Sequence, residues 1–88
     1  MANSNSMELT QEQQKKKAFV EYFLPLTVRA LFQEVDWLRF IVTEHAEVVE
    51  IDVTHVNKEK ETFKANVTGD SIVALTFDVL RRLEKEYC

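Results

Sequence analysis

The sequence predicts an α+β fold in which helices pack on one face of a small antiparallel sheet. Apolar residues recur at helical spacing between residues 18 and 42, alternate strictly with polar residues from residue 48, and return to helical spacing after residue 69. The expected order is two N-terminal helices, a β-hairpin and a C-terminal helix. We expect residues 1–9 to form a flexible N-terminal tail and residues 10–88 to form a single domain.

A capping box predicts where the first helix begins. Thr10 is followed three residues later by Gln13, so each side chain can bind the other residue's backbone N–H. Pro25 lacks an amide proton, and its ring would clash with the carbonyl of Glu21 at a cost of about 3 kcal/mol inside a helix. We therefore expect the chain to kink or break near Pro25 and to continue as a second helix as far as Val42.

Placed on a helix, the stretch from Ala18 to Val42 is apolar on two faces. One of these has a stripe, heptad-like from Leu24 onward, at Val20, Leu24, Val28, Leu31, Val35, Leu38 and Val42. A chain of 88 residues is too short to cover both faces. A two-fold partner that presents the same face is the commonest solution. The sequence therefore predicts a homodimer, whose interface residues we expect to be Leu26, Ala30, Trp37, Phe40 and Ile41. The alternative is that the first helix folds back over the second within one chain.

The alternation that begins at Val48 predicts a hairpin with one buried face. That inward face is expected to comprise Val49, Ile51, Val53, Phe63, Ala65 and Val67. Directly paired residues must share a face, so we expect Val53 to oppose Phe63 or Ala65 and the loop to contain three or five residues. A bare hairpin is marginally stable in water, and pairing of hairpin edges across a dimer would remove that weakness.

The last helix is predicted from Ile72 to about Tyr87, with Asp70 or Ser71 as its N-cap. Its broad buried face is expected to comprise Ile72, Val73, Thr76, Phe77, Val79, Leu80, Leu83 and Tyr87.

Composition and motifs argue against an enzyme, a metal site or a bound cofactor. The chain has one glycine, one cysteine and two histidines, so it has neither a glycine-rich phosphate loop nor a usual set of metal ligands. The lone cysteine, Cys88, excludes an intrachain disulfide and fits a reducing cytoplasm. We see no signal peptide and no apolar run that could span a membrane, and therefore expect a cytoplasmic protein.

Glu44, Glu47, Glu50 and Asp52 place four negative charges within nine residues that contain no Lys or Arg. A solvated surface explains them most simply, whereas the functional alternative is an acidic docking surface for a basic protein partner. We expect a small non-enzymatic interaction module of the kind that a phage or mobile element would use as an inhibitor or adaptor.

A small nucleic-acid-associated regulator is the alternative function. It would use the basic residues Lys15, Lys16, Lys17, Arg81 and Arg82. The net charge of −4 makes nucleic-acid binding the less expected of the two functions, because counterion release needs clustered Lys and Arg.

Overall fold

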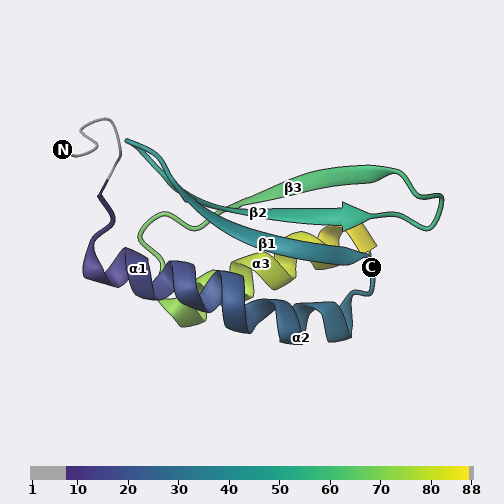
Figure 1. Cartoon of the computed structure of the whole chain (residues 1–88), viewed down its shortest axis with the longest axis horizontal. Coiled ribbons are helices and arrows are strands. Elements are labelled where there is room, and N and C mark those ends of the chain that lie inside the picture. The colour runs from purple at the N-terminus through teal and green to yellow at the C-terminus, as the bar shows by residue number, and fades with distance from the viewer. Residues whose placement is uncertain (1–7, 88) are drawn as a thin grey trace.

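The computed structural model describes residues 8–87, so most of the expected N-terminal tail lies outside the described residues. The described chain is an α+β fold with a three-stranded antiparallel sheet in the order β1-β2-β3 (Figure 1). Its elements are α1 (Gln11–Ala18), the π-helical segment η1 (Phe19–Phe23), α2 (Leu24–Leu31), β1 (Val35–Val42), β2 (Glu47–Thr54), β3 (Lys60–Asn66) and α3 (Ile72–Tyr87).

The first three elements form one N-terminal helix, so the expectation of two N-terminal helices is wrong. The helix begins with the predicted capping box between Thr10 and Gln13. Pro25 does not break it, because the helix widens into a π turn just before the proline, where the N–H of Leu24 bonds the carbonyl of Phe19. This wider turn accommodates a ring that an ordinary α turn would force against the preceding carbonyl.

The segment predicted as the end of the second helix is strand β1. The N-terminal helix ends at Leu31, and Phe32 already has an extended backbone. A β-bulge between Val35 and Trp37 inserts one residue into β1, so the buried residues Val35 and Leu38 are three positions apart instead of two. The bulge therefore gives a strand the spacing that helical periodicity also produces.

Strands β2 and β3 form the predicted hairpin, and all six residues of its predicted inward face are buried. The expected pairing was wrong in detail, because Ile51 opposes Phe63 and Val53 opposes Glu61. The loop has the predicted odd length: Thr54 pairs with Lys60, which leaves five residues in the turn.

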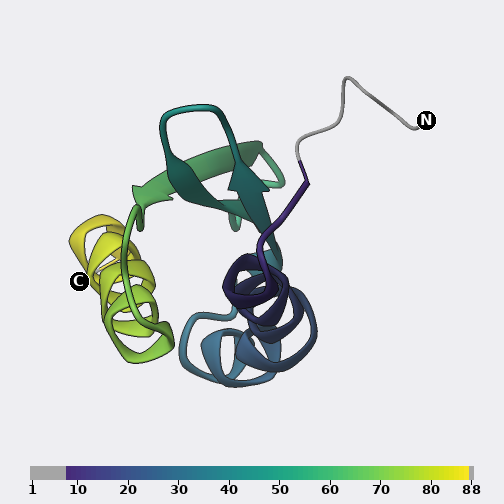
Figure 2. The ribbon, with the colours of Figure 1, turned by 90° about the vertical axis from the view of Figure 1, so that its left-hand side faces the viewer.

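The helices cover one face of the sheet, as the sequence predicts (Figure 2). In this end-on view, the sheet forms the upper layer, with the N-terminal helix and α3 beneath it. The N-terminal helix contributes Val20, Leu24 and Val28 to the core between the layers. All the strands contribute as well, so residues from every part of the described chain share one hydrophobic core.

Helix α3 begins and ends where the sequence predicts, and the Ser71 hydroxyl caps it by accepting the N–H of Ala74 at 3.1 Å. Its buried face is narrower than expected. Leu75, which the prediction omitted, is fully buried, whereas Val73 and Phe77 are 65% and 53% exposed. The N-terminal helix covers part of the same sheet face, so one stripe of α3 is sufficient.

Charged side chains from the helices meet both open edges of the sheet. The N–H of Phe40 points away from β2 and donates to Glu21 Oε2 at 3.0 Å, and Lys17 pairs with the same carboxylate. At the opposite edge, the carbonyl of Lys64 accepts a hydrogen bond from Arg82 Nε at 3.2 Å. These contacts occupy backbone groups that could otherwise pair with another strand. Strand β1 itself pairs with one edge of the predicted hairpin and relieves the marginal stability of a bare hairpin within the single chain.

Candidate interaction surface

The four acidic residues expected to bind a partner do not form one surface. Glu44 is exposed in the β1–β2 turn, whereas Glu47 is buried. Glu50 and Asp52 lie on the outer face of the sheet, where Arg39 pairs with both of them at 3.0 and 2.9 Å. The structure therefore separates these residues into an exposed turn, a buried contact and a cross-strand ion-pair cluster.

Glu47 joins three separate parts of the chain. Its carboxylate accepts hydrogen bonds from Gln13 Nε2 at 2.8 Å, Lys16 Nζ at 3.0 Å and the N–H of Gly69 at 3.1 Å. Burial alone would raise the pKa of Glu47, but these hydrogen bonds and the charge of Lys16 outweigh it and hold the pKa below its ordinary value of 4.5. Glu47 thus holds the N-terminal helix and the β3–α3 turn against β2. Neither the solvated surface nor the exposed docking surface expected from the sequence describes Glu47, because its side chain is buried.

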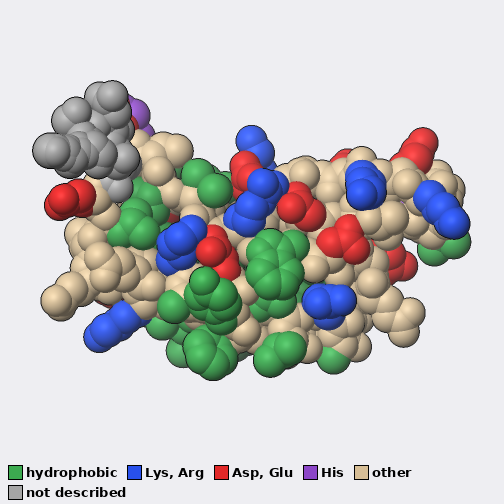
Figure 3. Space-filling model, in the orientation of Figure 1, with side chains coloured by type: hydrophobic (Ala, Val, Ile, Leu, Met, Phe, Trp, Pro, Cys, Tyr) green, Lys and Arg blue, Asp and Glu red, His purple; other side chains and the backbone are tan. Residues whose placement is uncertain are grey.

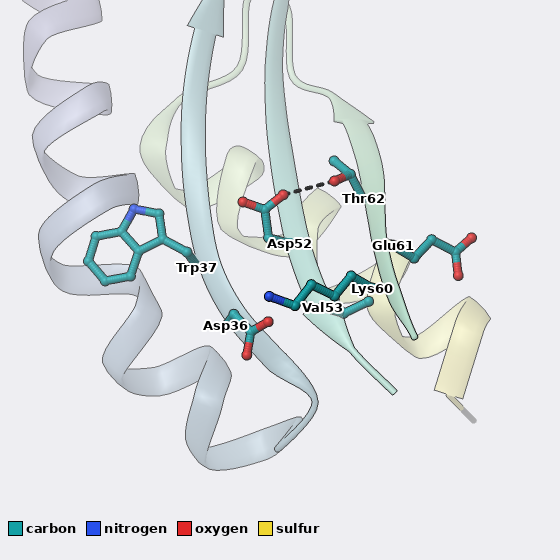
Figure 4. Close-up of a pocket in the computed structure, with 7 residues that line it drawn as sticks. All are labelled: Asp36, Trp37, Asp52, Val53, Lys60, Glu61 and Thr62. Atoms are coloured by element: carbon teal, nitrogen blue, oxygen red, sulfur yellow. Dashed lines mark hydrogen bonds between the residues drawn. The ribbon is translucent and has the colours of Figure 1, made fainter. Parts of the chain in front are cut away.

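The outer face of the sheet has an open hollow beside the bulge of β1 (Figure 4). The bulge places the neighbouring residues Asp36 and Trp37 on this same face. Two of the three carboxylates of the hollow already accept hydroxyl hydrogen bonds, Asp36 from Thr54 at 2.5 Å and Asp52 from Thr62 at 2.9 Å, and the third, Glu61, lies 2.8 Å from His55 Nε2. Such satisfied side chains stabilise a solvated sheet face. They give no arrangement of nucleophile and base that would indicate catalysis.

The basic residues of the nucleic-acid alternative are mostly engaged within the chain. Lys16 is buried against Glu47, and Lys17 pairs with Glu21 at 2.8 Å. Arg81 pairs with Asp78, and Arg82 pairs with Glu86 and lies over the ring of Phe63. Lys15 is exposed. The five residues lie on two different helices, and four of them pair with carboxylates, which reduces the support for a basic face that binds phosphates; nucleic-acid binding stays a prediction.

An apolar strip of the N-terminal helix faces solvent, and we call it the helix strip: Tyr22, Phe23, Leu26 and Ala30. Tyr22, Phe23 and Leu26 are 70%, 62% and 74% exposed, and Ala30 is exposed one turn further on. Figure 3 shows hydrophobic side chains gathered over this part of the helix and the adjoining strand. Trp37 of β1 is 43% exposed on the outer face of the sheet, and its side chain extends sideways from β1 towards the N-terminal helix (Figure 4). Large apolar side chains concentrated in this way indicate an interaction site.

The predicted dimer residues divide between this surface and the interior. Leu26 and Ala30 belong to the helix strip, and Trp37 lies beside it. Phe40 is only 2% exposed and belongs to the core, so its assignment to an interface is wrong. Ile41 is half-buried on the outer side of β1. Both assignments followed from treating β1 as helix, where a period of 3.6 replaces the true alternation.

Tyr22 and Phe23 are the residues of the helix strip that the predicted interface omitted. They lie four and three positions before Leu26, spacings that place residues on the same side of a helix. This signal was present in the sequence.

Two further observations concern the described residues. No group of three or more His, Cys, Asp or Glu side chains within residues 8–87 is arranged to hold a metal ion. In the same range, no helix has the length and apolar character needed to cross a membrane.

No family model matches the chain, and no curated protein or solved structure matches it either. Its function is therefore inferred from its own geometry.

Proposed function

We propose that this protein is a non-enzymatic interaction module that forms a homodimer through the helix strip. The observation that carries the proposal is the exposure of Tyr22, Phe23 and Leu26 on neighbouring turns of one helix, with Trp37 beside them. Complete burial of one such side chain stabilises an assembly by roughly 1.5 to 3 kcal/mol.

A second copy is the partner that this surface favours. Closed two-fold dimers are the commonest assemblies of soluble proteins, and they use one self-complementary patch on each copy. The strip is apolar, whereas the acidic residues Glu50 and Asp52 are already paired with Arg39. A basic protein partner on the acidic face therefore has less support than self-association through the helix.

Replacing Leu26 by glutamate is expected to dissociate the dimer without unfolding the chain. The side chain of Leu26 is 74% exposed in the single chain, so a charge there costs little until a second copy covers it. Sedimentation equilibrium at micromolar concentration should give a species of twice the 10.3 kDa chain mass for the original protein and the single-chain mass for Leu26→Glu.

Val56→Glu is the matched control. Val56 is 90% exposed in the β2–β3 loop, so the same charge is introduced into another apolar, exposed position. This variant should sediment as the original protein does. A single-chain mass for the original protein would disprove the dimer, and equal dissociation by both variants would show that the helix strip is not the interface.

A further inference from the structure

We infer that the two copies pair their N-terminal helices antiparallel, with the two-fold axis passing beside Leu26. This inference rests on the homodimer proposed above and adds the geometry of its interface. Leu26 is the most exposed of the three large residues of the helix strip and lies near its centre, with aromatic residues before it and small or cationic residues after it.

The two halves of the strip complement each other. Tyr22 and Phe23 form a bulky half, whereas the half after Leu26 presents Arg29 and Ala30. In an antiparallel pair, the residues before Leu26 on one helix meet those after Leu26 on the other. Ala30 then leaves room for an aromatic ring of the partner, because small residues let helices approach closely where large ones project. The bulky half of each copy thus packs against the small half of the other, and this contact occurs twice in one closed interface.

Arg29 supplies the charge complementarity. It is exposed, and within residues 8–87 it makes no ion pair. A guanidinium group binds favourably to the face of an aromatic ring. Antiparallel pairing brings Arg29 of each copy towards Tyr22 and Phe23 of the other. Each guanidinium group can then contact an aromatic ring when the interface covers it.

A parallel arrangement lacks these matches. It would place Arg29 opposite Arg29 of the other copy, where the like charges repel each other. It would also place the two bulky Tyr22 side chains opposite each other. The antiparallel register relieves both conflicts. It also leaves the outer face of the sheet uncovered, because the strip lies on the helical layer (Figure 1).

Cysteine cross-linking tests this geometry in a Cys88→Ser background, which removes the native thiol. Leu26→Cys should form a covalent dimer with itself under mild oxidation, because the two copies of residue 26 face each other at the axis. Tyr22→Cys and Ala30→Cys should each cross-link poorly alone and efficiently when mixed. Residues 22 and 30 are about 12 Å apart along a helix, whereas a disulfide joins Cα atoms about 4.4 to 6.8 Å apart.

The outcomes distinguish the antiparallel geometry from the homodimer itself. Rapid cross-linking of Leu26→Cys, together with selective cross-linking of the mixed pair, would support the antiparallel interface. Sedimentation of the reduced proteins as dimers, with Tyr22→Cys cross-linking to itself as fast as the mixture does, would overturn the antiparallel geometry and leave the homodimer standing. Sedimentation of the Cys88→Ser protein as a single chain would overturn both.

Discussion

Replacing Glu47 by alanine is expected to lower the free energy of unfolding by about 3 to 5 kcal/mol, as is usual when one partner of a buried ion pair is removed. The side chains of Lys16 and Glu47 are only 5% and 11% exposed. The variant would leave the Lys16 ammonium buried without its partner. It would also remove the acceptor used by Gln13 and by the N–H of Gly69. Urea unfolding followed by circular dichroism measures the loss.

Glu44→Ala is the control for this experiment. Glu44 belongs to the same acidic group in the sequence, but its side chain is 84% exposed. Its removal should change the free energy of unfolding by no more than about 0.5 kcal/mol. Equal losses for the two variants would contradict the structural role assigned to Glu47.

The contribution of Glu47 should depend on pH. Its pKa is lowered in the folded protein, so the stability it adds is fully present above its ordinary value of 4.5 and is lost as pH falls through the folded-state pKa. The difference in unfolding free energy between the original protein and Glu47→Gln should therefore shrink as pH falls below about 4.5. The neighbouring Asp78 carboxyl, and then burial, raise the pKa of Asp70, which acts in the opposite direction. Both proteins retain Asp70 and the two largest causes of its raised pKa, so most of its effect cancels in the comparison; the charge of Glu47 adds a smaller part of that pKa increase, which Glu47→Gln removes. A difference that stayed constant down to the acid transition would contradict this assignment.

Replacing Phe63 by alanine is the second change expected to have a large effect, with a loss of about 3 to 5 kcal/mol. Phe63 is 4% exposed, and its ring centroid lies 6.2 Å from that of Tyr87 and 6.3 Å from that of His55. The guanidinium carbon of Arg82 lies 4.8 Å from the centroid of the same ring. The substitution would therefore open a cavity where β3, the β2–β3 loop and the end of α3 meet.

Lys64→Ala is the matched control on the next residue of β3. The side chain of Lys64 is exposed on the outer face of the sheet, and only its backbone carbonyl binds Arg82. Its truncation should change the unfolding free energy by no more than about 0.5 kcal/mol. Similar shifts of the urea midpoint for the two variants would show that the inward and outward faces of β3 had been exchanged.

Local signals predicted several elements of the fold correctly. The capping box at Thr10, the cap at Ser71 and the alternation in β2 and β3 each depend on residues a few positions apart. Strand β1 was missed because its bulge gives Val35, Leu38 and Val42 the steps of three and four that a helix also gives. The β-branched and aromatic residues of VDWLRFIV favoured a strand. No glycine or proline marked the turn that precedes it.

The candidate surface was predicted less well than the fold, because its parts depend on contacts between distant residues. Nothing near Glu47 in the sequence shows that Lys16, 31 positions earlier, lies against it. The same holds for Arg39, which neutralises Asp52 from the neighbouring strand. Leu26 and Ala30, which were predicted at the dimer interface, are both exposed on one side of the helix because one helical period relates them; the interface itself stays a prediction. Trp37 and Phe40 were placed on one surface because β1 was treated as part of that helix.

The hydrogen bonds at the two sheet edges also bear on how large an assembly can grow. Unprotected outer strands allow copies to add one after another, which leads to fibres of indefinite length. Here Glu21 occupies the N–H of Phe40 on one outer strand, and Arg82 occupies the carbonyl of Lys64 on the other. Association through a single self-complementary patch ends once that patch is covered. A chain with an exposed apolar helix can therefore associate strongly while remaining a finite particle of two copies.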